Sequence, residues 1–281
     1  MKVSKARSYI ASFGEQLKEE GKSSKTIIKY TGDIRIFFDW CDKNNIVEIT
    51  QNNLEQYKQV LLKIRKIAGC NSVIISLNNF FKRYFNKEKL YITTVRVQKR
   101  ASLDSVISVD EYELLLKTAL KIKDYRTYCI IRVLASSGMR VSELSFLTVE
   151  TLKEGKFTVN NKGKVRCVYL SNNICELLSR YCTYLNISSG LIFRSKKNPN
   201  KLIDKSQIWR KFKRLEEILN LKEGTIHAHC FRHFFAKQYI NKFHDICELA
   251  DILGHSNIET TRIYTRTTQN EKRNRIEQLG L

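Results

Sequence analysis

Apolar side chains recur at a helical spacing through the N-terminal third of the chain, and no proline interrupts them. After the serine pair at residues 23–24, apolar positions follow three or four residues apart, which predicts an amphipathic helix that faces a small core. The asparagine pair at residues 52–53 predicts the start of the next helix, which we expect to end at Gly69, and Ser72 predicts the start of another. Residues 1–91 are therefore expected to form a basic bundle of four helices.

The helical period is lost in residues 92–105, which are polar and basic. A break of this kind is typical of a connection between domains. We expect residues 106–281 to form a second domain, with residues 267–281 as its polar C-terminal segment.

The second domain begins with a capping-box pattern, Ser108 with Glu111, which predicts a helix that ends at Gly138. Apolar residues then alternate with polar ones on both sides of residues 161–164, which predicts a β-hairpin with a lysine-bearing turn. Amphipathic helices follow. The expected fold class is mainly α with a small antiparallel β-hairpin (α+β), preceded by the N-terminal helical bundle.

Histidine and arginine share one face of a predicted helix over residues 227–236. His229, Arg232, His233 and Ala236 fall on that face, while three phenylalanines point the other way. We expect the phenylalanines to anchor the helix and the His/Arg face to be directed out of the core.

A tyrosine lies a short distance beyond a further histidine. Gly254 is expected to end the preceding helix, and Ser256 with Glu259 forms another capping-box pattern. This pattern predicts a helix that carries Tyr264 about two turns from its start, close to His255.

The charge of the chain indicates its partner. Lysine and arginine number 50 against 28 aspartate and glutamate, a net charge of +22, and both predicted domains are basic. A polyanion is the expected partner. The alternative, that the charge serves only solubility, explains the size of the excess less well.

Neither the apolar runs nor the cysteines indicate export. No run approaches the length of about 18 residues that a membrane span needs, and the N-terminus has no signal-peptide core. The eight cysteines form no C-x-x-C pair and mostly occupy apolar patterns, which is typical of buried thiols in a reducing compartment. We expect a cytoplasmic protein that does not associate with membranes.

The candidate side chains suit phosphoryl transfer without a metal or other cofactor. Arginine binds two phosphate oxygens with its planar fork, and a tyrosine hydroxyl can attack phosphorus when cations or a base assist it. No cluster of carboxylates of the kind that holds two metal ions is evident, which argues against a metal-dependent nuclease. A zinc site at His229 and His233 is a weaker alternative, because no second ligand pair has a familiar spacing.

Three motifs, together with Tyr264, carry a family resemblance. SGMRVSEL at residues 137–144, HCFRH at 229–233 and LGHS at 253–256 resemble the signature boxes of the tyrosine recombinase (phage integrase) family, in order and in spacing. Residues 1–90 are similar to the family's helical core-binding domain by size and position, so the resemblance is to its two-domain type.

The resemblance implies a role for each matching residue. Tyr264 would attack the scissile phosphate to give a 3′-phosphotyrosine link and a free 5′-hydroxyl. Arg140 and Arg232 would clamp the phosphate oxygens, His229 would assist deprotonation of the tyrosine, and His255 would hydrogen-bond the phosphate. No metal and no ATP would be needed.

The general-acid lysine is where the chain departs from the family pattern. The family hairpin reads roughly G-K-G-x-K-x-R, whereas NKGKVR at residues 161–166 is one residue shorter. We favour Lys162 over Lys164 as the acid. Glu143 would support the site rather than react.

The resemblance also implies the partners: double-stranded DNA recombination sites, a homo-tetramer on DNA that exchanges strands through a Holliday junction, and accessory DNA-bending proteins in some members. The C-terminal segment would dock on a neighbouring protomer. Phage, transposon and chromosome-resolution recombinases remain alternatives, and the first two would make this a mobile-element protein. Two other functions are alternatives to a recombinase: a type IB topoisomerase, and a non-catalytic DNA-binding regulator on the same scaffold.

Overall fold

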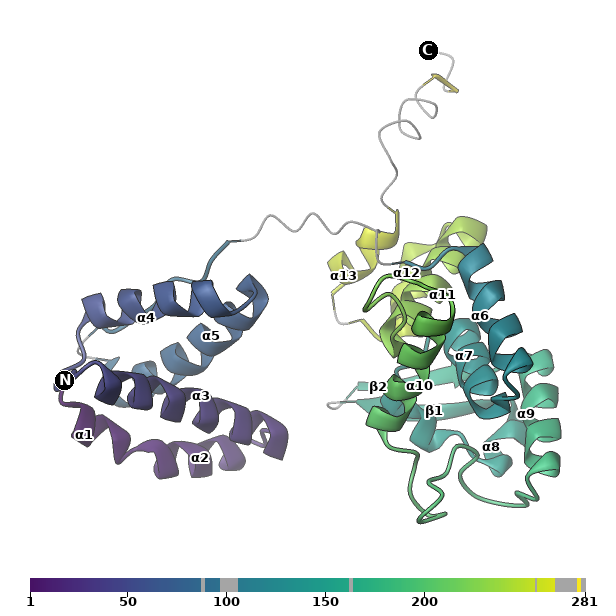
Figure 1. Ribbon diagram of the computed structural model, residues 1–281, viewed down its shortest axis with the longest axis horizontal. Helices are drawn as coiled ribbons and strands as arrows, with labels where there is room; N and C mark the ends of the chain where they lie inside the picture. The colour runs from purple at the N-terminus through teal and green to yellow at the C-terminus, as the bar shows by residue number, and fades with distance from the viewer. Residues whose placement is uncertain (87–88, 97–105, 162–163, 256, 266–276, 279–281) are drawn as a thin grey trace. The chain divides into compact units, whose positions relative to one another are not determined.

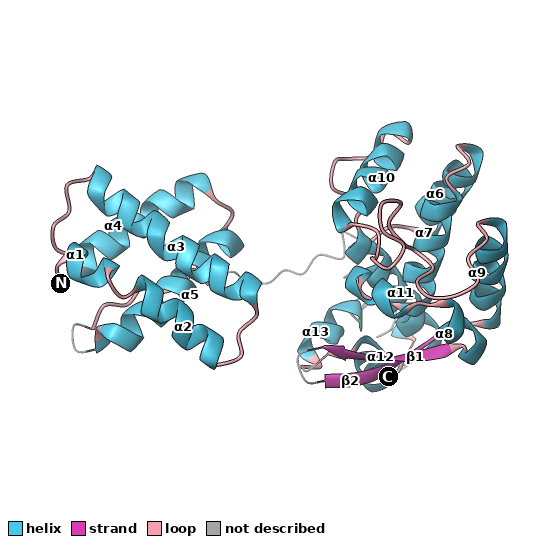
Figure 2. Ribbon diagram, turned by 90° about the horizontal axis from the view of Figure 1, so that it is seen from below, coloured by secondary structure: helices cyan, strands magenta, loops and turns pink. Residues whose placement is uncertain are grey.

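The chain divides into two compact units, Met1–Arg100 and Ala101–Leu281 (Figure 1). The computed structural model describes residues 1–86, 89–96, 106–161, 164–255, 257–265 and 277–278. Figure 2 shows helices in both units and antiparallel strands in the second. The expected fold class, mainly α with a small antiparallel hairpin, is confirmed.

The first unit is a helical bundle around an aromatic core. Five phenylalanines (Phe13, Phe37, Phe38, Phe80 and Phe81) are fully buried, and several of their rings meet edge to face. Such contacts add to the free energy of apolar burial. The helices are α1 (Val3–Arg7), α2 (Ile10–Glu19), α3 (Ser24–Lys43), α4 (Gln51–Ile64) and α5 (Ile67–Tyr84).

The break between α4 and α5 lies earlier than the sequence predicts. Gly69 and Ser72, expected at a helix end and a helix start, both lie inside α5. The chain is extended instead at Arg65 (φ −133°, ψ 152°) and at Lys66 (φ −63°, ψ 148°). Apolar residues continue three residues apart across this break, at Leu61, Ile64, Ile67 and Cys70, so the pattern does not locate it.

A strap of three side-chain amides holds residues 91–95 on the first unit. Each amide both donates to and accepts from the backbone of one residue, at 2.7 to 3.2 Å: Gln51 with Tyr91, Asn78 with Ile92, and Asn71 with Val95. The side chain of Ile92 is also fully buried in the core. The start of the expected linker therefore packs on this unit, and its residues 97–105 lie outside the described residues.

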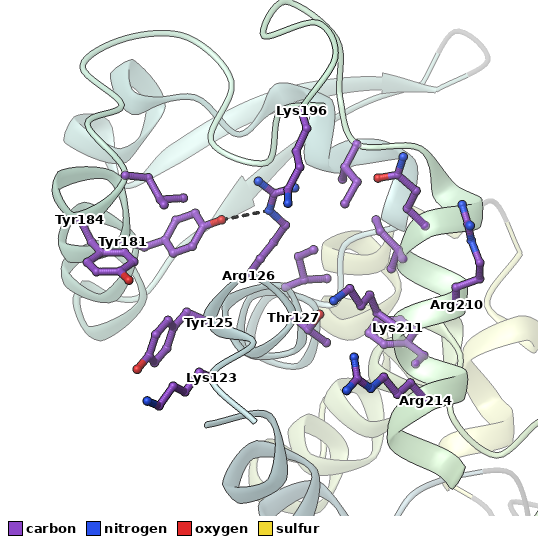
Figure 3. Close-up of a pocket in the computed structure, with 16 residues that line it drawn as sticks. Lys123, Tyr125, Arg126, Thr127, Tyr181, Tyr184, Lys196, Arg210, Lys211 and Arg214 are labelled. Atoms are coloured by element: carbon purple, nitrogen blue, oxygen red, sulfur yellow. Dashed lines mark hydrogen bonds between the residues drawn. The ribbon is translucent and has the colours of Figure 1, made fainter. Parts of the chain in front are cut away.

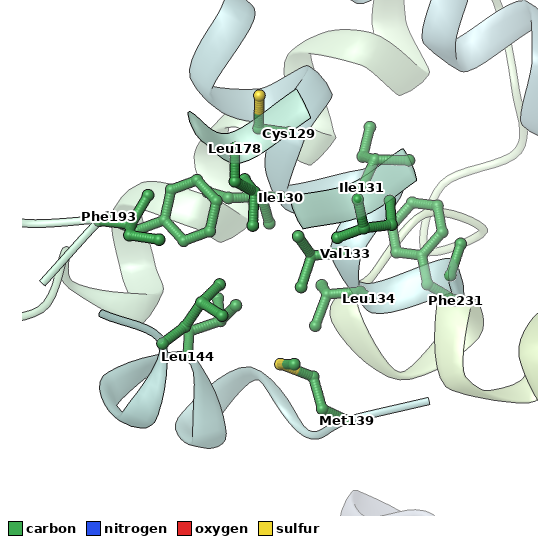
Figure 4. Packing of buried hydrophobic residues seen from close by; sticks show 14 of the residues in the cluster. Cys129, Ile130, Ile131, Val133, Leu134, Met139, Leu144, Leu178, Phe193 and Phe231 are labelled. Carbon is green, nitrogen blue, oxygen red and sulfur yellow. The ribbon is translucent and has the colours of Figure 1, made fainter. Parts of the chain in front are cut away.

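The second unit is built around α7 (Tyr125–Ser137), which packs against α6 (Val109–Lys121), α9 (Asn172–Tyr184) and α11 (Ala228–Phe243). Figure 4 shows apolar residues of α7 among side chains from the surrounding segments, including Leu178, Phe193 and Phe231. The other elements are η3 (Val141–Phe146), α8 (Val149–Glu154), β1 (Lys156–Asn161), β2 (Lys164–Tyr169), α10 (Lys205–Ile218), α12 (Ile246–Leu253), α13 (Glu259–Arg262) and η4 (Ile263–Thr265).

Two helices replace the single helix predicted between Ser108 and Gly138. The Ser108 capping box is present, but α6 ends before Lys123, whose φ is +56°. Asp124 then caps α7 by accepting from the backbone N–H of Thr127 at 3.3 Å. The predicted hairpin is confirmed, with Val159 of β1 opposite Arg166 of β2.

None of the described helices is long and apolar enough to cross a membrane. All eight cysteines are free. Burial raises the pKa of the Cys41, Cys129 and Cys230 thiols to about 12, so these side chains act as small apolar residues. Cys247 is exposed, against the expectation of buried thiols.

Candidate active site

The first element of the site is the turn between α7 and η3. Gly138 ends α7 with φ +61°, and a Cβ at this position would lie 2.5 Å from the ring of Phe235. Only glycine combines this backbone conformation with so close a neighbour. The turn buries Met139 and leaves the Arg140 side chain 35% exposed at the start of η3.

Glu143 is a buried carboxylate between two arginines. It is 1% exposed and accepts from the Arg140 side chain at 3.1 Å, from the Arg140 backbone N–H at 2.8 Å and from Arg166 Nη2 at 2.5 Å. A buried carboxylate with these donors can hold both guanidinium groups in fixed positions. Arg140 therefore pairs with Glu143 and still presents its exposed side to solvent.

Arg166 joins the hairpin to the end of α12. Its Nη1 donates to the carbonyl oxygen of Ile252 at 2.6 Å, while its Nη2 binds Glu143. Gly254 has φ +63°, and a Cβ there would lie 2.6 Å from Arg166 Cδ. The glycine thus allows Arg166 to pass close to the backbone that leads to His255.

Arg232 is buried to 1% exposure, although we expected its helix face to point out of the core. The expectation was wrong because two helix ends receive this guanidinium. Nη1 donates to the carbonyl of Gly138 at 2.7 Å, after α7, and Nη2 donates to that of Leu253 at 2.6 Å, the last residue of α12. Carbonyls at helix C-termini carry partial negative charge and stabilise a cation. Desolvation, with further lowering by Arg140 and Arg166, brings the pKa of Arg232 to about 10, so it stays charged at neutral pH.

His255 connects Arg232 to the tyrosine-bearing segment. Its Nε2 lies 3.0 Å from Arg232 Nη2, and its Nδ1 lies 2.7 Å from Oγ1 of Thr261. Because a guanidinium can only donate, Nε2 must accept and the proton must be on Nδ1, which donates to Thr261. Desolvation and then Arg232 lower the pKa of His255 to about 4, which agrees with this neutral tautomer.

The hydroxyl of Tyr264 lies 2.5 Å from Nδ1 of His233. Tyr264 is 2% exposed and packs with apolar residues of α11 and α12. Desolvation raises its pKa, and the charge of Arg232 opposes that change. Desolvation and the neighbouring His229 lower the pKa of His233 to about 4, so His233 is neutral and can accept the phenolic proton.

Comparison with known proteins identifies the family of the chain. The sequence profile of the Phage integrase family matches residues 105–271, and that of the "Phage integrase, N-terminal SAM-like domain" matches residues 10–90. The chain belongs to the phage integrase family. The expected family membership is confirmed.

Relatives of this integrase-family protein match it over nearly its whole length. A "Tyrosine recombinase" of Pseudothermotoga lettingae is 29% identical, with 92% of each chain covered. "Tyrosine recombinase XerA" of Pyrococcus horikoshii is 28% identical, with 96% of this chain and 92% of the relative covered.

Solved structures of similar proteins share the fold. A XerH site-specific recombinase bound to difH substrate, in a pre-cleavage complex, has a TM-score of 0.71 at 22% identity and covers 95% of this chain and 83% of that one. The Tn1549 transposon integrase with circular intermediate DNA has a TM-score of 0.73 at 19% identity and covers 99% and 100%.

The fold brings five of the six candidate residues of this integrase-family chain into one region: Arg140, His229, Arg232, His255 and Tyr264. The sixth, Lys162, lies outside the described residues, and so does Ser256 of the predicted capping box. The helix predicted to carry Tyr264 is short, since α13 has four residues and Tyr264 itself lies in η4.

Two contacts of the site differ from those that the sequence predicts. His229 was expected beside the tyrosine hydroxyl, but His233 makes that contact, and the ring of His229 packs edge-on against the ring of His233 with centroids 4.4 Å apart. Arg166, which follows the hairpin turn, was not singled out. Its signal was its place in the final position of the family's hairpin pattern.

The zinc alternative gains no support. In the part of the chain that the structure describes, no group of three or more His, Cys, Asp or Glu side chains could hold a metal ion. Instead, the ring of His229 contacts the ring of His233, which in turn contacts the ring of Tyr264.

Proposed function

We propose that this chain is a site-specific DNA recombinase that cleaves and rejoins DNA through Tyr264. The observation that carries the proposal is the tyrosine hydroxyl held by a neutral histidine, next to the buried guanidinium of Arg232. The names and titles of its relatives, among them recombinases bound to DNA, point in the same direction.

The three arginines and one carboxylate create a site for one phosphodiester. Arg140, Arg166 and Arg232 bring three positive charges and Glu143 one negative charge, so the group carries a net charge of +2. A phosphate that becomes pentacoordinate gains negative charge, which this excess stabilises. Arg140 is the exposed member and would meet the phosphate first.

In the proposed cleavage step, the Tyr264 oxygen forms a bond to phosphorus and the bond from phosphorus to the 5′ oxygen breaks. The phenolic proton passes to a histidine, His233 or His229, and the leaving 5′ oxygen takes a proton from a lysine of the hairpin turn. The products are a 3′-phosphotyrosine and a free 5′-hydroxyl, so the energy of the broken bond is kept for rejoining. Neither metal nor ATP takes part.

The described arrangement must change before the phosphate can bind. Nε2 of His255 accepts from Arg232, so it cannot donate to a phosphate in this tautomer. We propose that the phosphate replaces this contact by taking Arg232 Nη2, after which His255 can carry a proton on Nε2. Tyr264, at 2% exposure, must also become accessible.

For assembly, we propose a homo-tetramer on two DNA sites that acts through a Holliday junction, with residues 267–281 docking on a neighbour and accessory DNA-bending proteins at some sites. We place the protein in the cytoplasm with its DNA, and we propose the domain division 1–91, 92–105 and 106–281.

A plasmid carrying two copies of the target site separates the three candidate functions. Recombinant product supports the recombinase. Relaxation of plasmids without the site, and no recombinant product, would identify a topoisomerase. Tight binding without cleavage would identify a regulator. Sequencing the DNA covalently attached to the protein in cells would supply the target site for this experiment.

The choice between Lys162 and Lys164 has its own test. An alanine variant of the general acid should lose cleavage and regain it on a substrate with a 5′-thiolate leaving group, which needs no acid. The other lysine's variant should behave alike on both substrates. If neither variant is rescued, the acid is not in this hairpin.

A further inference from the structure

The hydroxyl of Thr261 is buried beside His255. Thr261 lies in α13 and is 0% exposed, and its Oγ1 lies 2.7 Å from Nδ1 of His255. Among the residues that the structure describes, His255 is the only hydrogen-bonding partner of this hydroxyl. A polar group that water does not reach depends on its protein partners, so the hydroxyl and the ring determine each other's hydrogen bonding.

Arg232 and Thr261 favour opposite tautomers of His255. Nε2 accepts from Arg232, because a guanidinium can only donate, so the ring proton lies on Nδ1 and the Thr261 oxygen accepts it. In this tautomer the hydroxyl hydrogen of Thr261 has no acceptor within the described ranges of the chain. A buried donor without an acceptor costs free energy. The contact with Arg232 therefore imposes the Nδ1–H tautomer, and the Thr261 hydroxyl opposes it.

Loss of the Arg232 contact would reverse this preference. A hydroxyl can donate as well as accept, so Thr261 can turn its O–H toward an unprotonated Nδ1. Nε2 then carries the ring proton, on the side from which Arg232 has been taken. The ring gains one proton from solvent at Nε2 and releases one to solvent at Nδ1, so it stays neutral. The Thr261 hydroxyl and Nδ1 are then both paired.

We propose that Thr261 is a positioning residue that sets the tautomer of His255. Its hydroxyl accepts from Nδ1 while Arg232 occupies Nε2, and it donates to Nδ1 when a phosphate displaces that contact. His255 then donates to the phosphate through Nε2 as a neutral ring. The proposal rests on the proposed function, since the phosphate is the scissile one.

The charges around His255 disfavour the alternative, a doubly protonated ring. Desolvation is the largest cause that lowers the pKa of His255 to about 4, and the charged neighbours that lower it further are Arg232, Arg140, His229 and Arg166. A change of tautomer supplies a proton on Nε2 without adding another positive charge to this group.

The tautomer in the free protein is the first measurement. Long-range ¹H–¹⁵N correlation spectra distinguish the Nδ1–H ring, the Nε2–H ring and the doubly protonated ring, and the variant His255→Phe identifies the His255 signals among the five histidines. The wild type should show Nδ1–H at pH 7, and Thr261→Ser should keep it. Thr261→Val removes the hydroxyl and should give a mixture of the two neutral tautomers. A wild type with Nε2–H, or the same single tautomer in Thr261→Val as in the wild type, would overturn the proposal.

The rate of covalent complex formation on a nicked substrate is the second measurement. Thr261→Val should lower this rate about tenfold, the effect of about one hydrogen bond, and Thr261→Ser should keep it. The loss should disappear in the His255→Phe background, where the hydroxyl has no ring nitrogen to pair with. An equal loss in both backgrounds would show that Thr261 serves the fold alone and would overturn the proposal.

Two further valine variants are controls for the loss of a threonine hydroxyl. Thr260 is exposed on α13, and its hydroxyl donates to the carbonyl of Asn257 at 2.7 Å. Thr127 is buried at the N-terminal end of α7, where Figure 3 shows it at a cavity of about 810 Å³ that neither Arg232 nor His255 lines. Thr260→Val and Thr127→Val should keep the His255 tautomer and the wild-type rate. A mixture of tautomers in either control would overturn the assignment to Thr261.

The spectrum of the trapped covalent complex completes the test. His255 should show Nε2–H in the wild-type complex, and a doubly protonated ring there would overturn the proposal. A wild-type protein that forms no covalent complex would count against the recombinase, whereas the spectra of the free protein test the role of Thr261 without any cleavage.

Discussion

The phenolic oxygen of Tyr264 lies 2.5 Å from Nδ1 of His233, one residue beyond the buried Arg232 on α11. The two residues come from segments that are 31 positions apart in the chain. Their contact places a neutral acceptor on the hydroxyl that is proposed to attack DNA.

His233 should act as the acceptor of the tyrosine proton. The variant His233→Gln keeps a hydrogen-bond acceptor but cannot take up a proton, so the rate of covalent complex formation should fall by about 10² to 10⁴-fold. Single-turnover cleavage of a nicked substrate measures this rate. His229→Gln is the matched control, and a full loss there with no loss at His233→Gln would assign the base to His229.

Arg166 should stabilise the site through Glu143. In the variant Arg166→Met the buried Glu143 loses an ion-pair partner, and the free energy of unfolding should fall by up to about 3 kcal/mol. Urea unfolding measures the loss. Adding Glu143→Gln to Arg166→Met should cost less than the sum of the two single changes, because the pair is coupled. Additive losses of unfolding free energy would contradict the ion pair between Arg166 and Glu143.

Gly254 should be required for space as well as for its backbone conformation. In the variant Gly254→Ala an alanine must adopt the left-handed backbone conformation, which costs about 1–2 kcal/mol of stability. Its Cβ would also lie 2.6 Å from Arg166 Cδ. Gly190→Ala is the control, because Gly190 has φ +72° and no atom within 4 Å of its added Cβ. Thermal unfolding should show a larger drop in melting temperature for Gly254→Ala than for Gly190→Ala. Equal drops would mean that the close approach of Arg166 to Gly254 does not restrict this position.

Stability should fall as the pH drops from about 6.5 to about 4. Desolvation lowers the pKa of His233 and His255 to about 4 in the folded protein, whereas both titrate near 6.5 when unfolded. The unfolded chain therefore binds more protons in this window, so the two histidines stabilise the fold above pH 6.5 and lose that contribution toward pH 4. The double variant His233→Gln, His255→Gln should show a flatter melting temperature over this range than the wild type. Parallel curves would contradict the shifted pKa values.

The sequence predicted the elements that have strong local signals. The capping box at Ser108 and the hairpin on either side of residues 161–164 follow from residues that are neighbours in the chain. The motif boxes likewise located Arg140, Arg232 and Tyr264.

The remaining features depend on contacts between distant segments. The burial of Arg232 requires the ends of α7 and α12 to converge on it, and nothing in the local pattern of α11 contains that information. The contact from Arg166 to Glu143 spans 23 residues and crosses from a strand to a 3₁₀ helix. The short break at Arg65 is hidden for a different reason, because apolar residues continue at helical spacing on both sides of it.

The most direct test of the central claim is to identify the residue that becomes linked to DNA. A nicked substrate that prevents rejoining is incubated with the wild-type protein, the complex is digested with protease and nuclease, and the nucleotide-bearing peptide is sequenced by mass spectrometry. We expect a nucleotide attached through its 3′ phosphate to Tyr264, and no adduct from Tyr264→Phe. An adduct on another residue, or an undiminished adduct from Tyr264→Phe, would contradict it.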